Sequence, residues 1–266
     1  MSETEGMSGA DTLSVATVTL VRDPEEDILM RAALAELSRQ GLRVAVADGG
    51  SPSSFLDAIG ALPGFELRRG VTGGLLAQVR ASLDLARSWG TRRVLYTEPD
   101  KHSFFTTHLT GFLEAAAVNR DADLVLAARS VESFSTYPPI QQRVETMVND
   151  LCADATGITA DYSYGPFLFA ASALPELADL APDVGWGWRP YVFARIVAGG
   201  GRLHVVSGNF ECPPSQRGQN RTEQAHRLRQ LAQNAKGLSL AIDESLSERG
   251  PWIDPGGAAR RQQTGE

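Results

Sequence analysis

A short segment, residues 94–102, places an apolar strand directly before an acidic turn, and it constrains the fold more than any other stretch. Residues 94–96, Val-Leu-Tyr, are of the apolar and β-favouring types that form strands buried on both faces. Pro99 cannot donate a hydrogen bond to a neighbouring strand, so the strand should end there. Glu98 and Asp100 then lie at the carboxyl end of a strand, the edge of an open α/β sheet where ligands bind.

The spacing of these two acids suits a divalent cation. Two carboxylates on one turn can hold Mg²⁺ or Mn²⁺, because both ions prefer hard oxygen ligands and share them readily with a diphosphate. Acid-x-acid turns are common, so a solvated acidic turn is the alternative. Lys101 follows at once and is one of only two lysines, with Lys236. His102 comes next, either as a further metal ligand or phosphate donor or as an incidental neighbour.

The segments around this turn alternate between strand and helix signals. Asp23 followed by Pro24 is a strong helix start, and Gly41 ends that helix. The expected strands are residues 13–21, 43–47, 65–68, 93–97 and 123–128, and the expected helices between them are 24–40, 75–88 and 104–119. This alternation predicts an α/β fold with a mostly parallel central sheet and helices on both faces.

The second half of the chain is less regular. Its expected helices are residues 138–154, 174–180, 191–198 and 222–246, and its expected strands are 165–171 and 202–207. Residues 1–11 are polar and acidic and are expected to be disordered, and residues 251–266 are expected to form a tail.

Composition narrows the class of protein. A net charge of −7 argues against a nucleic-acid partner, because such proteins usually carry a basic face. The only two cysteines, Cys152 and Cys212, are too few for a disulfide framework or a zinc site and favour a reduced, cytoplasmic protein. Neither a signal peptide nor an apolar run of membrane-spanning length is found, so no membrane partner is expected.

A series of short motifs, in one order along residues 13–210, resembles the GT-A glycosyltransferases. The resemblance is strongest to the family-2-like group and its relatives that make glucosyl- or mannosyl-glycerate compounds. The motifs are Asp48-Gly-Gly-Ser51, Gly73-Gly74, Glu98-Pro-Asp100, Ala122-Asp-Leu-Val-Leu-Ala-Ala-Arg129, Gly165-Pro-Phe-Leu-Phe169 and Gly185-Trp-Gly-Trp188. The resemblance implies a metal-dependent enzyme, using Mg²⁺ or Mn²⁺, that moves a sugar, above all a hexose, from a nucleotide-sugar donor to a small soluble acceptor.

The resemblance also implies a division of the chain. Residues 12–210 would form the catalytic domain, with a nucleotide-binding half at 12–130 and an acceptor half at 131–210. Residues 211–250 would form a C-terminal loop and helix. A homodimer is left open as the oligomeric state.

Donor-binding roles follow from the resemblance residue by residue. The loop after the first strand would meet the nucleotide, through Val21, Arg22 and Asp23. Asp48 would accept a hydrogen bond from the base or ribose, unless its side chain instead holds the Gly-Gly bend that follows it. Gly73 and Gly74 would let the backbone approach the diphosphate at a helix N-terminus, or would simply connect a strand to a helix. Lys101 would contact the donor.

The same resemblance assigns the metal ligands. Asp100 would bind the metal, Glu98 would bind the ribose or a metal-bound water, and His102 would be a further ligand. Glu98 departs from the aspartate usual at its position and is longer by one methylene, which puts direct coordination by both acids in doubt.

The sequence also departs from the family pattern at the position of the catalytic base. An inverting enzyme needs a carboxylate to take the acceptor's proton, and the family often places it in or beside the Gly-Trp-Gly turn. Arg189 stands there instead and would contact the diphosphate or an anionic acceptor; Asp183 is the nearest candidate base and Asp161 the second. A retaining mechanism needs no such base. Trp186 and Trp188 would either stack on a sugar or pack in the core.

The basic segment after the last strand has two interpretations. It would close over an anionic substrate as a lid, or it would present a solvated helix face. Its residues are Gln216, Arg217, Arg221, His226, Arg227 and Arg229.

Two other functions remain open. A nucleotidyltransferase of sugar phosphates would carry a Gly-rich basic loop after the first strand, where this chain has Val-Arg-Asp-Pro. A non-catalytic nucleotide-sugar-binding relative is compatible with the departures at Glu98 and Arg189.

Overall fold

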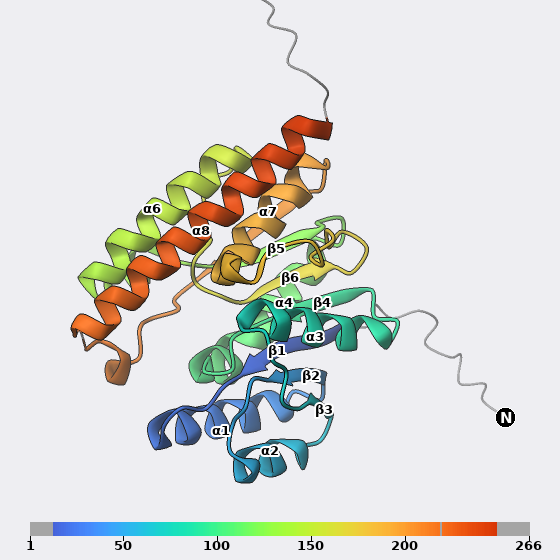
Figure 1. The fold of residues 1–266 in the computed structure, drawn as a ribbon, viewed down its shortest axis with the longest axis vertical. Helices are drawn as coiled ribbons and strands as arrows, with labels where there is room; N and C mark the ends of the chain where they lie inside the picture. The colour runs from blue at the N-terminus through green and yellow to red at the C-terminus, as the bar shows by residue number, and fades with distance from the viewer. Residues whose placement is uncertain (1–12, 219, 249–266) are drawn as a thin grey trace, which may run out of the picture.

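The computed structural model describes residues 13–218 and 220–248, so the terminal segments expected at 1–11 and 251–266 lie outside the described residues. Its centre is a seven-stranded sheet of order β3-β2-β1-β4-β6-β5-β7 (Figure 1). The strands are β1 (Leu13–Thr19), β2 (Arg43–Asp48), β3 (Phe65–Arg68), β4 (Arg93–Tyr96), β5 (Leu124–Arg129), β6 (Phe167–Ala170) and β7 (Leu203–Gly208).

The sheet is mostly parallel, as predicted. Strand β6 is antiparallel to both of its neighbours, β4 and β5, whereas the other pairs run parallel. The chain leaves β1 toward β2 and β3 on one side and returns to β4 on the other side. The direction in which successive strands are added to the sheet therefore reverses between β1 and β4. An open α/β sheet binds ligands at such a reversal of strand order.

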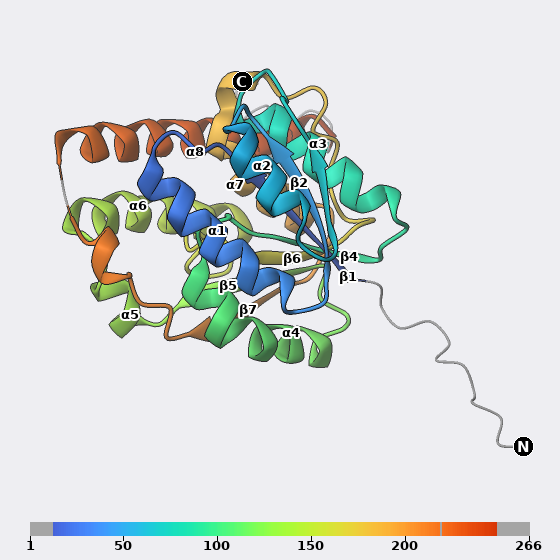
Figure 2. The same ribbon diagram turned by 90° about the horizontal axis from the view of Figure 1, so that it is seen from below.

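Helices cover both faces of the sheet (Figure 2). One core packs α1, α2 and α4 onto the face that carries Val15, Val44 and Leu95. The other core packs α3, α6, α7 and α8 onto the face that carries Ala16, Tyr96 and Phe167. Because side chains alternate between faces along a strand, neighbouring residues of β1 and β4 belong to different cores. The helices are α1 (Pro24–Ser38), α2 (Ser53–Gly60), α3 (Leu75–Ser88), α4 (Leu109–Val118), α5 (Val131–Ser135), α6 (Pro139–Thr156), α7 (Trp188–Ala198) and α8 (Arg221–Glu248).

Local signals explain where the first helices begin and end. The Asp23 side chain accepts hydrogen bonds from the backbone N–H groups of Glu25 and Glu26, so it caps α1 as predicted. Gly41 has a φ of +69°, a conformation that favours glycine and ends the helical run. The helix expected over 104–119 begins instead with a π-helical turn, η1 (Phe104–His108), which continues into α4.

The long helix α8 lies beside α6 and α7 and packs on a 3₁₀ segment, η2 (Pro182–Gly187) (Figures 1 and 2). Two glycines allow this close approach. A Cβ atom added to Gly237 would lie 1.9 Å from the carbonyl oxygen of Gly187, and one added to Gly187 would lie 2.0 Å from the carbonyl oxygen of Gln233. The C-terminal helix is therefore seated tightly on the Gly-Trp-Gly turn.

The prediction of a short helix over residues 174–180 is wrong. Residues 174–177 have no regular secondary structure, only 178–179 form a turn, and Pro175 lies within this segment. The Arg80 guanidinium donates hydrogen bonds to the carbonyl oxygens of Leu177 and Leu180, at 2.6 Å for Leu180. Arg80, on α3, therefore holds this segment in place.

Across the ranges 13–218 and 220–248, none of the helices combines the length and the apolar character that crossing a bilayer requires.

Candidate functional site

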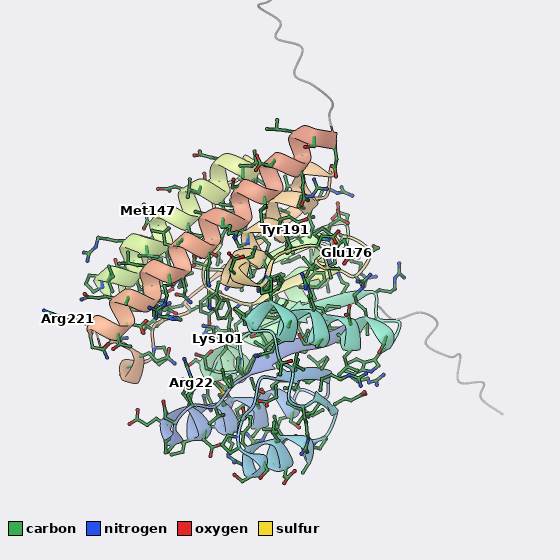
Figure 3. All side chains as sticks on the ribbon, viewed as in Figure 1. Arg22, Lys101, Met147, Glu176, Tyr191 and Arg221 are labelled. Carbon is green, nitrogen blue, oxygen red and sulfur yellow. The ribbon has the colours of Figure 1, made fainter. Side chains whose placement is uncertain are left out.

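A cavity of about 950 Å³ opens at the carboxyl ends of β1, β4 and β5. Its floor comes from the ends of these strands, and its walls come from α1, the start of α3, α6 and α8. It lies at the reversal of strand order between β1 and β4, where the sequence predicted ligand binding. In Figure 3, Lys101 lies between the first half of the sheet and α8, and Arg22 lies nearby, just before the start of α1.

The acidic turn after β4 faces this cavity through Glu98, Asp100 and Lys101. The Oδ1 atom of Asp100 is buried and has no hydrogen-bond partner among the described residues. The Lys101 ammonium lies 4.0 Å from that oxygen. Burial alone would lower the pKa of Lys101, but the charges of Asp100 and then Glu98 outweigh it, so the pKa is raised. Lys101 therefore keeps its positive charge beside the carboxylates.

Glu98 is fixed in place by two contacts. Its Oε1 atom accepts a hydrogen bond of 2.9 Å from Arg189, which joins the acidic turn to the start of α7. Its Oε2 atom is buried without a hydrogen-bond partner in the described chain and packs against Gly165, where an added Cβ atom would lie 2.1 Å away. Gly165 also has a φ of +136°, so both the backbone and the contact with Glu98 require glycine.

These carboxylates fit a cation only in part. Asp100 offers an unpartnered buried oxygen, which is the kind of group that a divalent ion satisfies. Glu98 is held by Arg189, so direct coordination by both acids is not supported. Among the residues described, no three His, Cys, Asp or Glu side chains are grouped to hold a metal. An ion bound here would depend on the substrate diphosphate and water for its other ligands.

His102 does not join the two acids. Its side chain is not part of the cavity lining, and it lies near Glu36 on α1. The pKa of Glu36 is lowered mainly by its hydrogen bond from Arg39, with a smaller effect from the charge of His102. The expectation that His102 is a metal ligand is therefore not supported by the geometry.

The loop after β1 contributes only part of what was expected. Arg22 lines the cavity rim, where its guanidinium pairs with Glu26 on the first turn of α1. Val21 is buried, and its backbone N–H donates to the Ser51 hydroxyl at 2.9 Å. Asp23 is used as the cap of α1, and neither it nor Val21 belongs to the lining.

Asp48 lies at the end of β2, and its carboxylate is already hydrogen-bonded by neighbouring protein groups. It is fully buried, and its carboxylate accepts hydrogen bonds from the Thr19 hydroxyl at 2.8 Å and from the backbone N–H groups of Gly50 at 2.8 Å and Ser51 at 2.9 Å. The Ser51 hydroxyl donates to it as well. The alternative interpretation, in which Asp48 holds the Gly-Gly bend, is the one that the structure shows.

The Gly73–Gly74 loop joins β3 to the start of α3. Their φ angles are +100° and +82°, which favour glycine, and Gly74 is the N-cap of α3 and lines the cavity. No side chain caps this helix, so its first backbone N–H groups are left for another partner. Gly73 itself is not part of the lining.

Neither carboxylate expected to act as the base is free in the cavity. Asp183 is exposed outside the cavity and accepts a hydrogen bond of 2.6 Å from Lys236, which is the main reason that its pKa is lowered. Asp161, whose side chain is 9% exposed, accepts hydrogen bonds from the Arg129 guanidinium at 2.6 and 2.9 Å. Burial opposes the charge of Asp161, but Arg129 outweighs burial and lowers the pKa.

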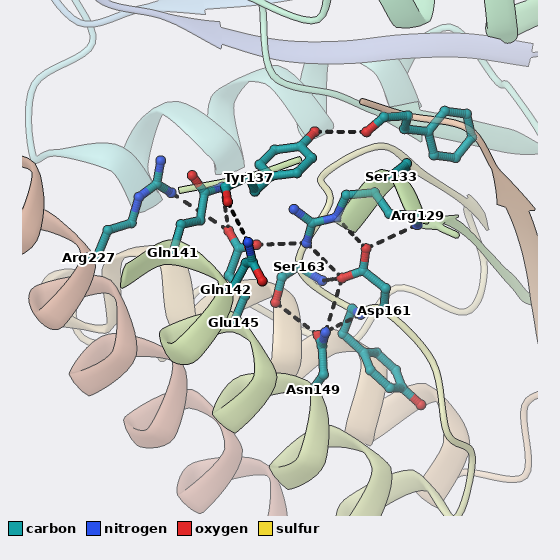
Figure 4. A network of polar contacts seen from close by, with 12 residues as sticks. Arg129, Ser133, Tyr137, Gln141, Gln142, Glu145, Asn149, Asp161, Ser163 and Arg227 are labelled. Carbon is teal, nitrogen blue, oxygen red and sulfur yellow. Dashed lines mark hydrogen bonds and ion pairs between the residues drawn. The ribbon is translucent and has the colours of Figure 1, made fainter. Parts of the chain in front are cut away.

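A polar network along one wall of the cavity was not predicted (Figure 4). Arg129, at the end of β5, also pairs with Glu145 on α6 at 2.7 Å, and its guanidinium lies 4.6 and 4.3 Å from the ring centres of Phe134 and Tyr137. Burial alone would lower the pKa of Arg129, but Glu145 and Asp161 outweigh burial and raise it. A sequence signal existed for α6, because Gln141, Glu145 and Asn149 recur at intervals of four.

Of the aromatic and basic residues in the second half of the chain, some pack in the core and others line the cavity. Trp188 is fully buried with its ring centre 4.7 Å from that of Tyr96, so it packs in the core. Trp186 is half-buried and lines the cavity. From the basic segment, Gln216, His226 and Arg227 also line it, as the lid interpretation requires, whereas Arg217, Arg221 and Arg229 do not.

Comparison with known proteins gives structural matches but no sequence match. No protein-family profile matches the chain, and no curated protein sequence does. Glucosyl-3-phosphoglycerate synthase from Mycobacterium tuberculosis in complex with UDP aligns with a TM-score of 0.60 at 15% identity, over 86% of this chain and 80% of that one. The same enzyme in complex with Mn²⁺, UDP-glucose and phosphoglyceric acid aligns with a TM-score of 0.57 at 14% identity, over the same shares.

A second enzyme gives the same result. Mannosyl-3-phosphoglycerate synthase from Rubrobacter xylanophilus aligns with a TM-score of 0.58 at 13% identity, over 92% of this chain and 78% of that one. The chain therefore has the α/β fold of these GT-A glycosyltransferases, and the resemblance suggested by the sequence motifs is confirmed at the level of the fold.

Proposed function

We propose that this chain is a metal-dependent glycosyltransferase that moves a sugar from a nucleotide-sugar donor to a small acceptor. The proposal depends most on Asp100, which lines a large cavity at the reversal of strand order and whose buried Oδ1 atom has no hydrogen-bond partner among the described residues. The fold adds support, because structural relatives were solved with Mn²⁺ and UDP-glucose.

The donor would lie along the carboxyl ends of β1 and β4. Its diphosphate would approach Gly74, where the uncapped start of α3 offers backbone N–H groups to negative charge. Lys101 would place a second positive charge beside the same phosphates. A divalent ion would be held by Asp100, and when bound it would supply neutralisation of the charge that builds on the leaving diphosphate.

Glu98 and Arg189 would act as a positioning pair. Arg189 reaches Glu98 and also donates to the carbonyl oxygen of Tyr162 at 3.2 Å, so it joins the acidic turn, α7 and the segment before β6. This arrangement would keep Asp100 in a fixed orientation toward the cavity. It would also exclude Arg189 from direct charge pairing with an acceptor.

The geometry favours a retaining transfer. An inverting reaction needs a carboxylate that takes the acceptor proton. Asp161 is held by Arg129, and Asp183 is paired with Lys236 outside the cavity. Glu145 and Glu223 do line the cavity, but they are paired with Arg129 and Arg227. A retaining reaction needs no separate base of this kind, so we propose it for this chain.

The test is a turnover assay on the full chain. Nucleotide sugars are incubated with acceptors in the presence of Mn²⁺ or Mg²⁺, and released nucleoside diphosphate and glycosylated product are followed by mass spectrometry. Asp100→Asn should lose at least about a hundredfold in turnover, since the loss of an electrostatic stabiliser in an active site typically has that size. Asp84→Asn is the matched control, because Asp84 is exposed on α3 and does not line the cavity.

Each alternative function has its own outcome in this assay. Release of pyrophosphate from a nucleoside triphosphate and a sugar phosphate would identify a nucleotidyltransferase. Donor binding without release of nucleoside diphosphate over a wide acceptor panel would identify a non-catalytic binding protein. Full activity of Asp100→Asn would contradict the proposed site.

A further inference from the structure

Gln78, on the first turn of α3, is a polar side chain without a partner in the described part of the chain. It lines the cavity and is only 6% exposed. None of the described residues forms a hydrogen bond with its side-chain amide. Buried polar groups are nearly always hydrogen-bonded in native proteins, so an unpartnered one calls for an explanation. The cavity therefore offers a free, buried amide to a ligand at this point.

The amide of Gln78 is placed by contacts on two sides. The Gln78 backbone N–H donates to the carbonyl oxygen of Gly74 at 3.2 Å, so the side chain starts one turn after the N-cap of α3. The amide itself lies against Gly49, where an added Cβ atom would be 2.2 Å from Nε2 of Gln78. The Gly49 N–H in turn donates to the carbonyl oxygen of Thr19 at 2.9 Å. Gln78 is therefore held between the start of α3 and the ends of β1 and β2.

Asp48, which the sequence favoured for contact with the base or ribose, is not available at this end of the cavity. Its carboxylate accepts hydrogen bonds from Thr19, Gly50 and Ser51, and it is not part of the cavity lining. Gln78 differs on both points, because it lines the cavity and keeps its amide free. The hydrogen-bonding role expected of Asp48 is therefore open to Gln78.

The chemistry of this part of the cavity suits a nucleobase. A base has apolar faces and a polar edge, so its site needs apolar contacts and a few directed hydrogen bonds. Apolar side chains of β1, of the residue after it and of α1 line the cavity, namely Val18, Leu20, Leu29 and Met30. An amide both donates and accepts a hydrogen bond, which matches a base edge that presents an acceptor beside a donor.

We infer that Gln78 binds the edge of the donor's nucleobase and is a specificity-determining residue of this chain. The inference rests on the proposed function, which places the diphosphate one turn earlier, at Gly74. The nucleoside would extend from the diphosphate toward the ends of β1 and β2, where Gln78 lies against Gly49. Because the amide is held in place, it favours the bases whose donor and acceptor groups match its own.

The test measures binding to the full chain by calorimetry in the presence of Mn²⁺. The probes are UDP, CDP, ADP and GDP, and pyrophosphate serves as the probe without a nucleoside. Gln78→Ala should weaken the tightest of the nucleoside diphosphates at least about tenfold, because two hydrogen bonds of typical net strength correspond to that change. The loss should differ among the bases, and the affinity for pyrophosphate should be unchanged. Asp84→Ala is the matched control, since Asp84 is exposed on the same helix and does not line the cavity.

A second variant, Gly49→Ala, moves the same amide without changing it. Gly49 is not part of the cavity lining, and its φ is not positive, so alanine fits the backbone there. The new Cβ atom would displace the Gln78 amide, which is the far end of a flexible side chain. Gly49→Ala should therefore weaken nucleoside diphosphate binding as Gln78→Ala does. The double variant should lose no more than Gln78→Ala alone, because both substitutions act on one contact.

Three results would overturn the inference. Unchanged binding of every nucleoside diphosphate by Gln78→Ala would show that the amide contacts no part of the nucleoside. An equal loss for all the bases would place the amide on the ribose, and an equal loss for pyrophosphate would show only a disturbed start of α3. Each of these results would leave the glycosyltransferase proposal intact. Failure of the wild type to bind any of the nucleoside diphosphates with Mn²⁺ would instead contradict the proposed function.

Discussion

The contact between α8 and the Gly-Trp-Gly turn gives a sharp prediction for Gly237→Ala. In a helix without tertiary contacts, replacing glycine by alanine stabilises by about 1 kcal/mol. At Gly237 the new Cβ atom would lie 1.9 Å from the carbonyl oxygen of Gly187 and 2.5 Å from its carbonyl carbon, both of which are backbone atoms. The two segments must therefore separate, and Leu238 and Ala241, which are buried next to this contact, must separate from the core with them.

We expect Gly237→Ala to be destabilised by about 1–3 kcal/mol, the usual cost of forcing extra atoms into a packed interface. The matched control is Gly111→Ala on α4, where an added Cβ atom meets nothing within 4 Å. That variant should be stabilised by up to about 1 kcal/mol. The measurement is urea unfolding followed by circular dichroism, with all three proteins compared at one pH. Equal stabilisation by both substitutions would refute the close packing of α8.

Two further predictions concern buried charges. Asp161→Asn should destabilise by about 1–3 kcal/mol in urea unfolding, because Arg129 loses its charge-assisted hydrogen bonds to Asp161 but keeps Glu145 as a carboxylate partner. The pKa of Asp161 in the folded protein lies below its unfolded value of about 3.9, so its contribution to the free energy of unfolding is complete above that pH and is lost as the pH falls through the folded pKa. The free energy of unfolding of Asp161→Asn should therefore fall less steeply than that of the wild type below about pH 4. Equal slopes for the two proteins would contradict this assignment. Gly165→Ala should displace Glu98 and weaken metal-dependent nucleotide binding measured by calorimetry, whereas unchanged binding would show that the position of Glu98 is not needed.

The framework of the fold could be predicted because its signals are local. The α/β alternation, the Asp23 cap and the acidic turn at the end of β4 each depend on residues within one or two turns of one another. The same locality explains one error. Residues 174–180 have helix-forming leucines, but their carbonyl oxygens bind Arg80, which is far away in the sequence.

The chemistry of the site could be predicted less well, because it depends on long-range partners. Asp161 was the second candidate for the catalytic base, and only the fold shows that β5 brings Arg129 against it. The sequence also left open whether Asp48 binds the donor or holds the Gly-Gly bend. The hydrogen bond from Thr19 on the neighbouring strand is one of the contacts that show the second role. The polar side chains of α8 suit either solvent or a cavity, and only its packing on α6 and α7 turns Arg227 and His226 toward the cavity.

The measurement that tests the central claim most directly is a thermal-shift screen of nucleoside diphosphates and nucleotide sugars, with and without Mn²⁺. A ligand present at a hundred times its dissociation constant should add about 2.7 kcal/mol of stability, which gives a clear rise in melting temperature. We predict a shift that requires the metal, is lost in Asp100→Asn and is retained in Asp84→Asn. No shift with any nucleotide, or an equal shift in Asp100→Asn, would contradict a nucleotide-sugar site at the acidic turn.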